Sequence, residues 1–447
     1  MEVLIENIIT YSFIVLLLAS LIYFQLRRGK KQTKTVKQKI EKAKELGFHE
    51  PVSLHPVVNL DICIGSTACV ASCPEKDILG MVEGKAATIH ASRCVGHGAC
   101  FHSCPLGAIT LVIGTEKRGV DLPHVSPHFE TNVKGIFIAG ELGGMGLIKN
   151  AVIQGKQAID NISKSLTRSP KAEYDIVIIG AGPAGISASL AAKESKLKAM
   201  TIEQDSLGGT VYSFPRKKII MTAPMHLPLY GKFKKTEITK TELLGLWDEV
   251  LTKNNITIQE NERVISIEKN EDHFVVQTNK KTVTTNSVLL AIGRRGSPRK
   301  LGVEGEELEK VSYRLIEPEF VNNQDVLVVG GGDSAIETAL ALIEGNNTIT
   351  LSYRGDSFSR IKPKNFENIK KAVEEKTIDV MFKSNIVKIS EKTVKIMFEQ
   401  NGVTVEKEIK NDLVYIFAGG ELPNEFLSKA GIRITKKYGE AVLKHQD

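Results

Sequence analysis

The stretch YDIVIIGAGPAGISASLAA, residues 174–192, decides the fold of this chain. An apolar run enters a glycine-rich loop and continues into an alanine-rich segment, which predicts a strand, a tight turn and a helix. Gly180, Gly182 and Gly185 form the pattern G-x-G-x-x-G at the turn. The first glycine permits the turn, the second lets a pyrophosphate approach the backbone, and the third lets helix and strand pack closely. The stretch therefore predicts a dinucleotide-binding α/β fold, with the phosphates at the N-terminus of the helix.

The sequence that follows strengthens this prediction. The run LKAMTIE predicts the next strand and ends at Glu203, at the distance from the glycine loop where a carboxylate can accept the ribose hydroxyls of a dinucleotide. The stretch DVLVVGGGDSAIETALAL repeats the arrangement, with Gly330, Gly332 and Ala335 in the three loop positions. The sequence therefore predicts two dinucleotide-binding folds in series.

The second of these folds has no acid at the ribose position. Tyr353 stands as far after Gly330 as Glu203 does after Gly180. Arg354 follows the tyrosine directly, and Arg360 is close in the sequence. An acid at this position would repel a 2′-phosphate, whereas an arginine accommodates one. The pattern therefore favours NADPH as the coenzyme, with NADH possible. The alternative is that both arginines are ordinary surface charges.

Two such fingerprints in one chain resemble the two-dinucleotide flavoprotein family that includes thioredoxin reductases and ferredoxin–NADP reductases of the same fold. The resemblance covers about residues 120–440. It extends to DSLGGT (205–210), with Gly208 and Gly209 beside the flavin, and to VLLAIGRR (288–295), whose Gly293 lies at the hinge into the NAD(P) domain. The stretch FAGGELPN (417–424) resembles the return hinge. The resemblance implies FAD in one domain and NAD(P)H in the other, with the nicotinamide ring stacked on the flavin.

One motif of this family stands in an unexpected place. In the family, a strand and an acid, written G-[IV]-[FY]-A-A-G-D, follow the return hinge, and the acid holds the ribityl chain of the flavin. Here nothing of the kind follows Asn424, but TNVKGIFIAGELGGMG (131–146) supplies the pattern upstream, with Gly140 and Glu141 in place of Gly-Asp. We therefore expect a circularly permuted fold, in which 135–139 is a parallel strand of the FAD sheet and a helix follows it. The alternative is that 131–146 is an unrelated strand, turn and helix.

All six cysteines fall between positions 63 and 104, in two copies of C-x5-C-x3-C-P that begin at Cys63 and Cys94. The duplication resembles the bacterial two-cluster ferredoxin pattern over about residues 57–115, except that the second cysteine of each motif is replaced. The family's pattern implies that the cysteine before each proline ligates the other cluster. The implied sets are Cys63, Ser66, Cys69 and Cys104 for one cluster, and Cys94, His97, Cys100 and Cys73 for the other.

Three thiolates at each site predict 3Fe–4S clusters, or 4Fe–4S clusters with an oxygen, nitrogen or water ligand on the last iron. Ser66 could instead be a small loop residue, and His97 a solvent-facing side chain. Three other interpretations of the cysteines are disulfides, zinc sites and a degenerate ferredoxin-like domain without metal. Disulfides would need an oxidising compartment, which the predicted topology disfavours. Zinc sites usually show paired C-x2-C, and this sequence has none. No cysteine follows Cys104, so the C-x2-C relay of thioredoxin reductases is absent from this sequence.

The N-terminal stretch IITYSFIVLLLASLIYFQL (8–26) has no charged residue and is about 28 Å long as a helix, close to the ~30 Å hydrocarbon core of a membrane. Residues 27–45 hold nine Lys or Arg and two Glu, which accounts for the net charge of +7 of the whole chain. The pattern predicts a single-pass anchor in the cytoplasmic membrane, with the catalytic domains in the cytoplasm. It gives no support to nucleic-acid binding. The alternative is a cleaved signal peptide, which the acidic start disfavours.

The fold class is α/β, with two permuted Rossmann-like FAD and NAD(P) domains preceded by an α+β ferredoxin-like domain and a transmembrane helix. The predicted function is a membrane-anchored oxidoreductase that passes electrons between NAD(P)H, FAD and iron–sulfur clusters to a protein or quinone acceptor, and we expect a homodimer. Hydride transfer needs no acid or base side chain, so no catalytic residue is predicted. The alternatives are a low-molecular-weight disulfide reductase of thioredoxin-reductase fold, and a non-catalytic redox sensor.

The predicted segments are 7–26 (membrane helix), 27–56 (basic cytoplasmic linker), 57–115 (ferredoxin-like), 116–165 (permuted FAD segment), 171–298 (FAD), 299–415 (NAD(P)) and 416–447 (return to FAD).

Overall fold

The structure is a computed structural model of the 447-residue chain. It describes residues 2–45, 49, 51, 54–75, 77–94, 96, 98–117, 119–144, 146–214, 219–221, 224–235, 237–294, 298–358, 361–400 and 402–443. Two of the predicted site residues, His97 and Arg360, lie outside this set. The chain divides into one unit of residues 1–120 with 438–447, and a second unit of residues 121–437.

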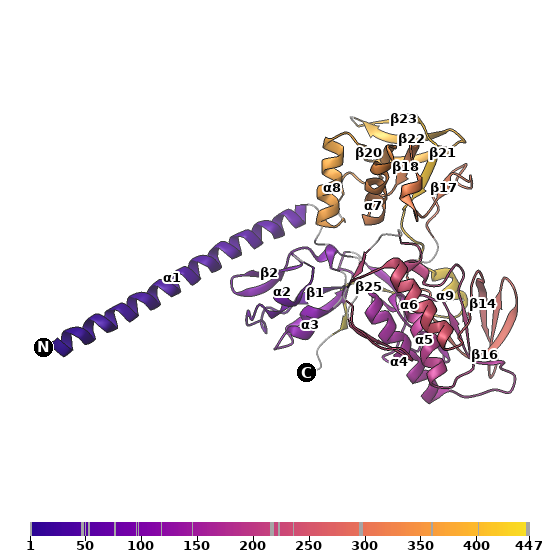
Figure 1. The fold of residues 1–447 in the computed structure, drawn as a ribbon, viewed down its shortest axis with the longest axis horizontal. Coiled ribbons are helices and arrows are strands. Elements are labelled where there is room, and N and C mark those ends of the chain that lie inside the picture. The colour runs from indigo at the N-terminus through magenta and orange to yellow at the C-terminus, as the bar shows by residue number, and fades with distance from the viewer. Residues whose placement is uncertain are drawn as a thin grey trace. The chain divides into compact units, whose positions relative to one another are not determined.

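The first unit contains the ferredoxin-like module, which we define as residues 54–113 with 440–443 (Figure 1). Its main sheet has the order β1-β4-β26, and a hairpin is formed by β2 and β3. The bounds of its elements are β1 (Leu54–Val58), α2 (Ala68–Ser72), β2 (Leu79–Val82), β3 (Lys85–Thr88), η1 (Ala91–Arg93), α3 (Ala99–Ser103), β4 (Ile109–Ile113) and β26 (Glu440–Leu443).

The two cysteine motifs form two equivalent turns of helix. The short helices α2 and α3 begin at the same position of their motifs, and the residue before each, Thr67 and Gly98, has left-handed backbone. The helices pack together, with the Oγ atoms of Ser72 and Ser103 2.7 Å apart. The internal duplication predicted from the sequence is therefore a structural duplication as well.

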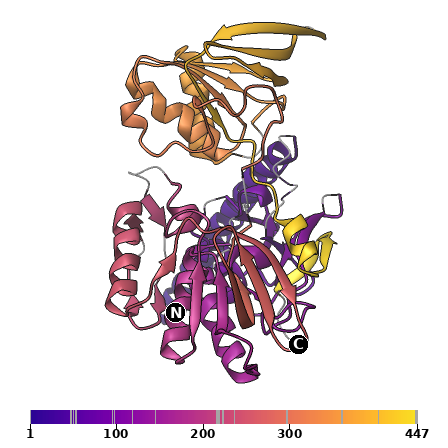
Figure 2. The same cartoon turned by 90° about the vertical axis from the view of Figure 1, so that its right-hand side faces the viewer.

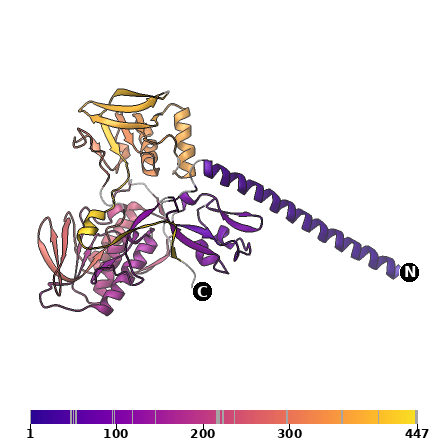
Figure 3. The same ribbon diagram turned by 180° about the vertical axis from the view of Figure 1, so that it is seen from behind.

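The N-terminal helix α1 runs from Glu2 to Glu45, so residues 27–45 of the predicted linker are helical. Its last turns pack on the hairpin of the ferredoxin-like module, where Val36 and Ala43 are buried. Lys37 pairs with Glu83 at 2.5 Å and Lys39 with Asp77 at 2.6 Å. The apolar part of α1 projects away from the module (Figure 3). The basic residues form a helix because a lysine-rich segment has good helix propensity once its apolar positions have a surface to cover.

The C-terminal segment corrects a second predicted boundary. Residues 416–447 were expected to return to the FAD domain, and α9 (Asn424–Lys429) does so, since Leu427 and Ile432 belong to that domain's core. The final strand β26, however, pairs antiparallel with β4 and completes the sheet of the ferredoxin-like module. The AVL run of β26 covers an edge that β4 would otherwise expose.

The first nucleotide-binding domain of the second unit is built on a seven-stranded sheet. The path is β13-β8-β7-β16-β15-β14, with β6 paired to β16. Helices α4 and α5 lie side by side against one face, where Ile159, Ile176 and Leu289 are fully buried (Figure 2). The bounds are β6 (Ile136–Ile138), α4 (Ile148–Ser165), β7 (Tyr174–Ile179), α5 (Pro183–Glu194), β8 (Ala199–Ile202), α6 (Lys240–Lys253), β13 (Ile258–Gln259), β14 (Val264–Lys269), β15 (Phe274–Thr278) and β16 (Thr282–Leu290).

The upstream segment predicted to complete this sheet does so. Strand β6 pairs in parallel with the C-terminal half of β16, with Ile136 opposite Val288 and Ile138 opposite Leu290. On its other side the same half of β16 pairs in parallel with β7. Helix α4 connects β6 to β7, as expected for a crossover between parallel strands. Residues 135–139 are thus part of the same sheet as the first glycine fingerprint.

The second nucleotide-binding domain has a five-stranded parallel sheet of order β17-β24-β18-β19-β20. Helices α7 and α8 cover one face, and a three-stranded antiparallel sheet, β21-β22-β23, covers the other. The bounds are β17 (Val311–Ser312), β18 (Asp325–Val329), α7 (Asp333–Ala341), β19 (Thr348–Ser352), α8 (Pro363–Glu374), β20 (Ile378–Met381), β21 (Ser384–Ile389), β22 (Thr393–Gln400), β23 (Val403–Lys410) and β24 (Leu413–Ile416).

Candidate functional site

The first glycine loop joins β7 to α5 and is shaped by close contacts. Gly180 has a φ of +103°, and a Cβ on it would lie 2.6 Å from the carbonyl oxygen of Ala291. A Cβ on Gly185 would lie 1.8 Å from the carbonyl oxygen of Gly180, whereas a Cβ on Gly182 would meet nothing within 4 Å. The loop is therefore compact on the protein side and open at Gly182. That open position, at the N-terminus of a helix, fits a pyrophosphate.

Glu203 follows β8 and lies against this loop. The N–H of Ala181 donates to its Oε2 at 2.7 Å, and the N–H of Asp205 donates to its Oε1 at 3.0 Å. Burial raises the pKa of this carboxyl, and the backbone hydrogen bonds oppose that rise. Each carboxylate oxygen has a second acceptor position, so Glu203 fits the ribose hydroxyls of an adenine dinucleotide.

The loop 205–210 packs against the first glycine loop. The N–H of Gly208 donates to the carbonyl oxygen of Ala181 at 2.9 Å, and a Cβ on Gly209 would lie 3.5 Å from Cα of Gly182. Gly293 follows β16, and a Cβ there would meet nothing within 4 Å. The structure therefore brings the predicted glycines of the first domain to one end of the parallel strands, where ligands bind in this class of fold.

The segment that carries β6, upstream of the first fingerprint, reaches that same end. The N–H of Gly140, directly after β6, donates to Oε1 of Gln154 on α4 at 2.8 Å. Glu141 is exposed and starts the 3-10 helix η2 (Glu141–Gly143). Burial lowers the pKa of Arg294, and the opposing charges of Glu141 and Asp121 raise it. Arg294 was not predicted as a site residue, although its position directly after Gly293 was a usable signal.

The second glycine loop has the same construction. A Cβ on Gly330 would lie 2.5 Å from the carbonyl oxygen of Phe417, and Ala335 is fully buried under the loop. A Cβ on Gly332 would meet nothing within 4 Å. The loop is again closed by protein on one side and open at its second fingerprint position, which fits the pyrophosphate of NAD(P)H.

The residues at the ribose position of this loop differ from those of the first. The ring of Tyr353 stacks on Phe358, with 5.8 Å between ring centroids, and a Cβ on Gly331 would lie 2.3 Å from that tyrosine ring. Arg354 directly follows Tyr353 and is exposed. No acid stands at this position in the sequence, and an exposed arginine fits a 2′-phosphate.

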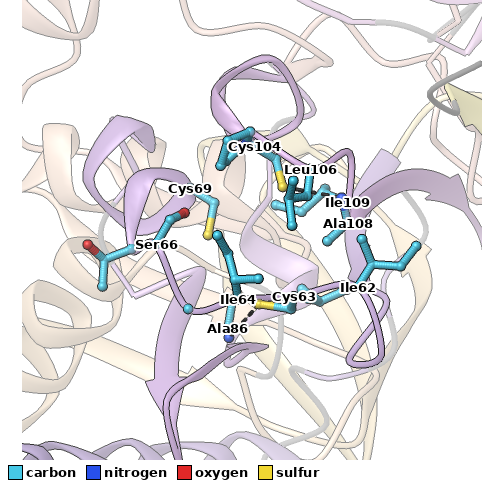
Figure 4. A pocket seen from close by; sticks show the side chains of 14 residues that line it. Ile62, Cys63, Ile64, Ser66, Cys69, Ala86, Cys104, Leu106, Ala108 and Ile109 are labelled. Atoms are coloured by element: carbon cyan, nitrogen blue, oxygen red, sulfur yellow. Dashed lines mark hydrogen bonds between the residues drawn. The ribbon is translucent and has the colours of Figure 1, made fainter.

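Three cysteines of the ferredoxin-like module line one pocket, as Figure 4 shows. Cys63 and Cys69 come from the first motif, and Cys104 from the second, which is the crossover that the family pattern implies. Backbone donors reach two of the sulfurs: the N–H of Ala86 lies 3.4 Å from Sγ of Cys63, and that of Ala108 lies 3.2 Å from Sγ of Cys104. Ser66 lines the same pocket.

The other three cysteines are the set that the family pattern implies for the second cluster. The pKa of Cys100 is raised to about 12 by burial and by the charges of Cys94 and Cys73. The pKa of Cys94 is raised to about 11 by burial, and Cys73 adds to that rise. Glu75, which the sequence did not single out, lies near Cys73, whose Sγ donates to the carbonyl oxygen of Glu75 at 3.1 Å.

The set of Cys63, Cys69 and Cys104 has the chemistry of a cluster site. Within the described part of the chain, no three His, Cys, Asp or Glu side chains are close enough together to bind one metal ion. The thiolates of an iron–sulfur cluster bind different irons and so stand farther apart. Three converging thiols with N–H donors to their sulfurs are the chemistry that such a cluster requires.

Comparison with known proteins decides the family. The model for pyridine nucleotide-disulphide oxidoreductases matches residues 177–447, which is more than half of the chain. The chain belongs to this family. A 4Fe-4S dicluster domain matches residues 55–105 of this oxidoreductase.

Similar proteins include two kinds of reductase. The chain is 31% identical to the bacilliredoxin reductase of Bacillus subtilis, over 59% of this chain and 82% of that protein. It is 30% identical to a ferredoxin–NADP reductase of Ignicoccus hospitalis, over 48% of this chain and 67% of that protein. A solved bacillithiol disulfide reductase from Staphylococcus aureus is 29% identical, with a TM-score of 0.51, over 59% of this chain and 81% of that one.

This oxidoreductase is therefore an FAD-dependent enzyme that uses NAD(P)H, and its dicluster domain carries iron–sulfur clusters. The glycine loops described above fit the two dinucleotides, and the two cysteine sets fit the clusters. FAD, when bound, takes up electrons as a hydride pair and releases them singly. The residues of this chain contribute position and electrostatics to that chemistry.

Proposed function

We propose that this oxidoreductase transfers electrons between NAD(P)H and a one-electron acceptor, in either direction, by way of FAD and two iron–sulfur clusters. The observation that carries the proposal is that Cys104 of the second motif lines one pocket with Cys63 and Cys69 of the first, which is a pairing of cysteines across the two motifs. A ferredoxin-like module with its cysteines so arranged is built to move single electrons. The acceptor is a protein or a quinone.

The dinucleotide sites are assigned as follows. FAD binds the first glycine loop, with Glu203 on its ribose and Glu141 on its ribityl chain. NADPH binds the second loop, with Arg354 on its 2′-phosphate, and Arg360 is proposed as a second contact from the sequence alone. The glycines and Ala335 of the two loops complete the list: Gly140, Gly180, Gly182, Gly185, Gly208, Gly209, Gly293, Gly330, Gly332 and Ala335.

We also infer that the fold is circularly permuted relative to its relatives. The pairing of β6 with β16 supports this, because β6 precedes the first fingerprint in the sequence. The family match begins at residue 177, and about a fifth of the bacilliredoxin reductase is left uncovered by the alignment. Both facts are expected when the segment that closes the sheet has moved to the N-terminal side.

The membrane anchor is part of the same proposal. The helix from Tyr11 to Glu45 is long and apolar enough to cross a membrane, and the apolar side chains of residues 11–26 are exposed on all faces. A helix of a water-soluble domain would bury one of its faces. The cationic residues that follow the apolar stretch favour placing both units in the cytoplasm, beside the cytoplasmic leaflet. A homodimer is proposed by likeness to the family only.

A low-molecular-weight disulfide reductase is the second candidate. The names of the Bacillus and Staphylococcus relatives favour it. The absence of any cysteine after Cys104 means that such a reaction would run without a protein dithiol beside the flavin. The two candidates differ in whether turnover needs the clusters.

The deciding experiment uses the full chain, purified without oxygen. In the wild-type protein, either NADPH should reduce the clusters, or NADP⁺ should oxidise clusters that dithionite has reduced, as followed by electron paramagnetic resonance. Cys69→Ala and Cys100→Ala should each remove a different iron signal, while NADPH still bleaches the flavin. Clusters that exchange no electrons with the coenzyme in either direction would exclude the electron-transfer function. Turnover of bacillithiol disulfide at an unchanged rate in both variants would establish the second candidate instead.

A further inference from the structure

The pocket of Cys63, Cys69 and Cys104 has one corner without a cysteine. Ser66 lines that pocket at the position where the two-cluster ferredoxin pattern has a fourth thiolate. The other three cysteines of the sequence, Cys73, Cys94 and Cys100, do not line this pocket. A four-iron cluster in this pocket therefore has one iron without a protein thiolate.

The corner faces solvent. Ser66 is exposed, and so are the neighbouring side chains of Ile64 and Leu106. The thiols of Cys63 and Cys104 are half-buried, and that of Cys69 is buried. A small molecule from solution thus has access to the Ser66 corner, while the protein covers the base of the pocket.

The loop that carries Ser66 is held in place by the module. Gly65 has a φ of +73°, and a Cβ on it would lie 1.8 Å from the carbonyl oxygen of Gly84, in the turn between β2 and β3. Only glycine allows this approach of loop and hairpin. The position of Ser66 is therefore set by the backbone rather than by its own contacts.

The lining of the pocket indicates the class of ligand. Among the described residues that line it, none is charged. The polar side chains besides the cysteines are the hydroxyls of Ser66 and Thr67. Iron in an iron–sulfur cluster prefers a soft thiolate to a neutral hydroxyl. A thiolate from solution is consequently a better fourth ligand than either side chain.

We propose that the iron at the Ser66 corner of the cluster held by Cys63, Cys69 and Cys104 binds a small thiolate from solution. The proposal rests on the proposed function only in requiring a four-iron cluster at this site. It does not require that the cluster exchange electrons with NAD(P)H. Ser66 marks the open corner, and it is not the final ligand.

The test is an equilibrium titration of the full chain in its cluster-loaded form, reduced by dithionite without coenzyme. Addition of 2-mercaptoethanol should shift the electron paramagnetic resonance signal of this cluster, with saturation. Ser66→Cys supplies a protein thiolate and should remove the shift. Ser66→Ala, the matched control, leaves the corner without a thiolate and should keep the shift of the signal. His97→Cys changes the other motif and should also keep it.

Four results would overturn the proposal. The first is a four-iron wild-type cluster whose signal does not shift at saturating thiol. The second is an unchanged shift in Ser66→Cys, and the third is loss of the shift in Ser66→Ala. The fourth is a Cys63 site that holds only three irons after anaerobic reconstitution. If the cluster does not assemble in Ser66→Cys, the titrations of the wild-type protein and of Ser66→Ala still test the proposal. A protein that binds the thiol but exchanges no electrons with NAD(P)H would refute the proposed function alone.

Discussion

Gly155 of α4 lies directly against the backbone of Ala184 in α5, since a Cβ on Gly155 would be 2.1 Å from that carbonyl oxygen. Ala184 belongs to the first turn of the helix that follows the first glycine loop. The helix from the permuted segment and the helix from the fingerprint are therefore in van der Waals contact where the phosphate site begins. A change at this contact should affect both the stability of the domain and its hold on FAD.

Gly155→Ala should destabilise the first nucleotide-binding domain by about 1–3 kcal/mol, the usual cost of overpacking a tight contact. Thermal unfolding, followed by the fluorescence of released flavin, measures the effect. Gly245→Ala is the matched control, because Gly245 is exposed on α6 and a Cβ there meets nothing within 4 Å. The free energy of unfolding of that control should rise by about 0.5–1 kcal/mol, because alanine has a better helix propensity than glycine. Equal melting temperatures for Gly155→Ala and wild type would mean that the two helices do not constrain each other.

Glu203 should make FAD affinity depend on pH. Burial raises the pKa of its carboxyl above the ordinary glutamate value, so it becomes protonated sooner than a surface glutamate as the pH falls. The protonated form accepts fewer hydrogen bonds from the ribose, so the dissociation constant of FAD should rise as the pH is lowered toward the raised pKa. Glu203→Gln should bind FAD more weakly at neutral pH and lose most of this dependence. An unchanged pH profile in Glu203→Gln would assign the effect to another group.

Arg354 should distinguish the two coenzymes. Arg354→Ala removes a charge-assisted contact to the 2′-phosphate and should cost roughly 1–3 kcal/mol for NADPH, with little change for NADH. The rate of flavin reduction at a series of coenzyme concentrations measures both. Lys371→Ala is a suitable control, since Lys371 is an exposed cation on α8 of the same domain. Equal losses for NADPH and NADH would show that Arg354 does not recognise the phosphate.

The permuted segment should be required for FAD binding. A chain of residues 121–437 keeps β6 and α4, whereas a chain of residues 174–437 loses both, with the buried side chains of Ile136, Ile138, Ile159 and Ile162. At about 1.5–3 kcal/mol for each buried side chain, the loss is comparable to the whole stability of a domain. The longer chain should bind FAD and be reduced by NADPH, and the shorter one should not. Full FAD occupancy in the shorter chain would contradict the permutation.

The orientation of the anchor is tested by reporters fused to the C-terminus. A reporter that works only in the cytoplasm should be active, and one that works only outside the membrane should be silent, because the cationic residues follow the apolar stretch. The protein should also stay with the membrane fraction after an alkaline wash. Reversing the charge of Lys30, Lys31 and Lys34 together should weaken the preference for this orientation. Activity of the outside reporter in the wild-type protein would overturn the topology and reopen disulfide pairing.

The sequence predicted those elements that have strong local patterns. The strands β7 and β18 with their glycine loops were found because an apolar run, a glycine turn and a helix are adjacent in the chain. Strand β6 was found through the family motif, since three buried residues alone do not distinguish a strand from other short apolar runs. The crossed cysteine sets followed from the ferredoxin pattern.

Other features depend on contacts between distant residues and left no local signal. Strand β26 is short, and its partner β4 lies far upstream, before both glycine fingerprints. The helix α1 continues past the apolar stretch because Val36 and Ala43 find a surface on the hairpin, which the lysine-rich sequence does not reveal. Sequence patterns report local preference, and these two features are products of tertiary packing.

The continuity of α1 has a consequence for how a redox partner meets this protein. Under the proposed topology, Leu26 ends the apolar stretch and Val36 contacts the ferredoxin-like module ten residues later, a rise of about 15 Å along the helix. A flexible tether would let the module sample a hemisphere of positions above the lipid. A helix fixed to the hairpin through Lys37 and Lys39 instead holds the module at a nearly constant height. Its search for a membrane-bound partner then becomes diffusion in a plane, with the cluster sites carried at a set level above the bilayer surface.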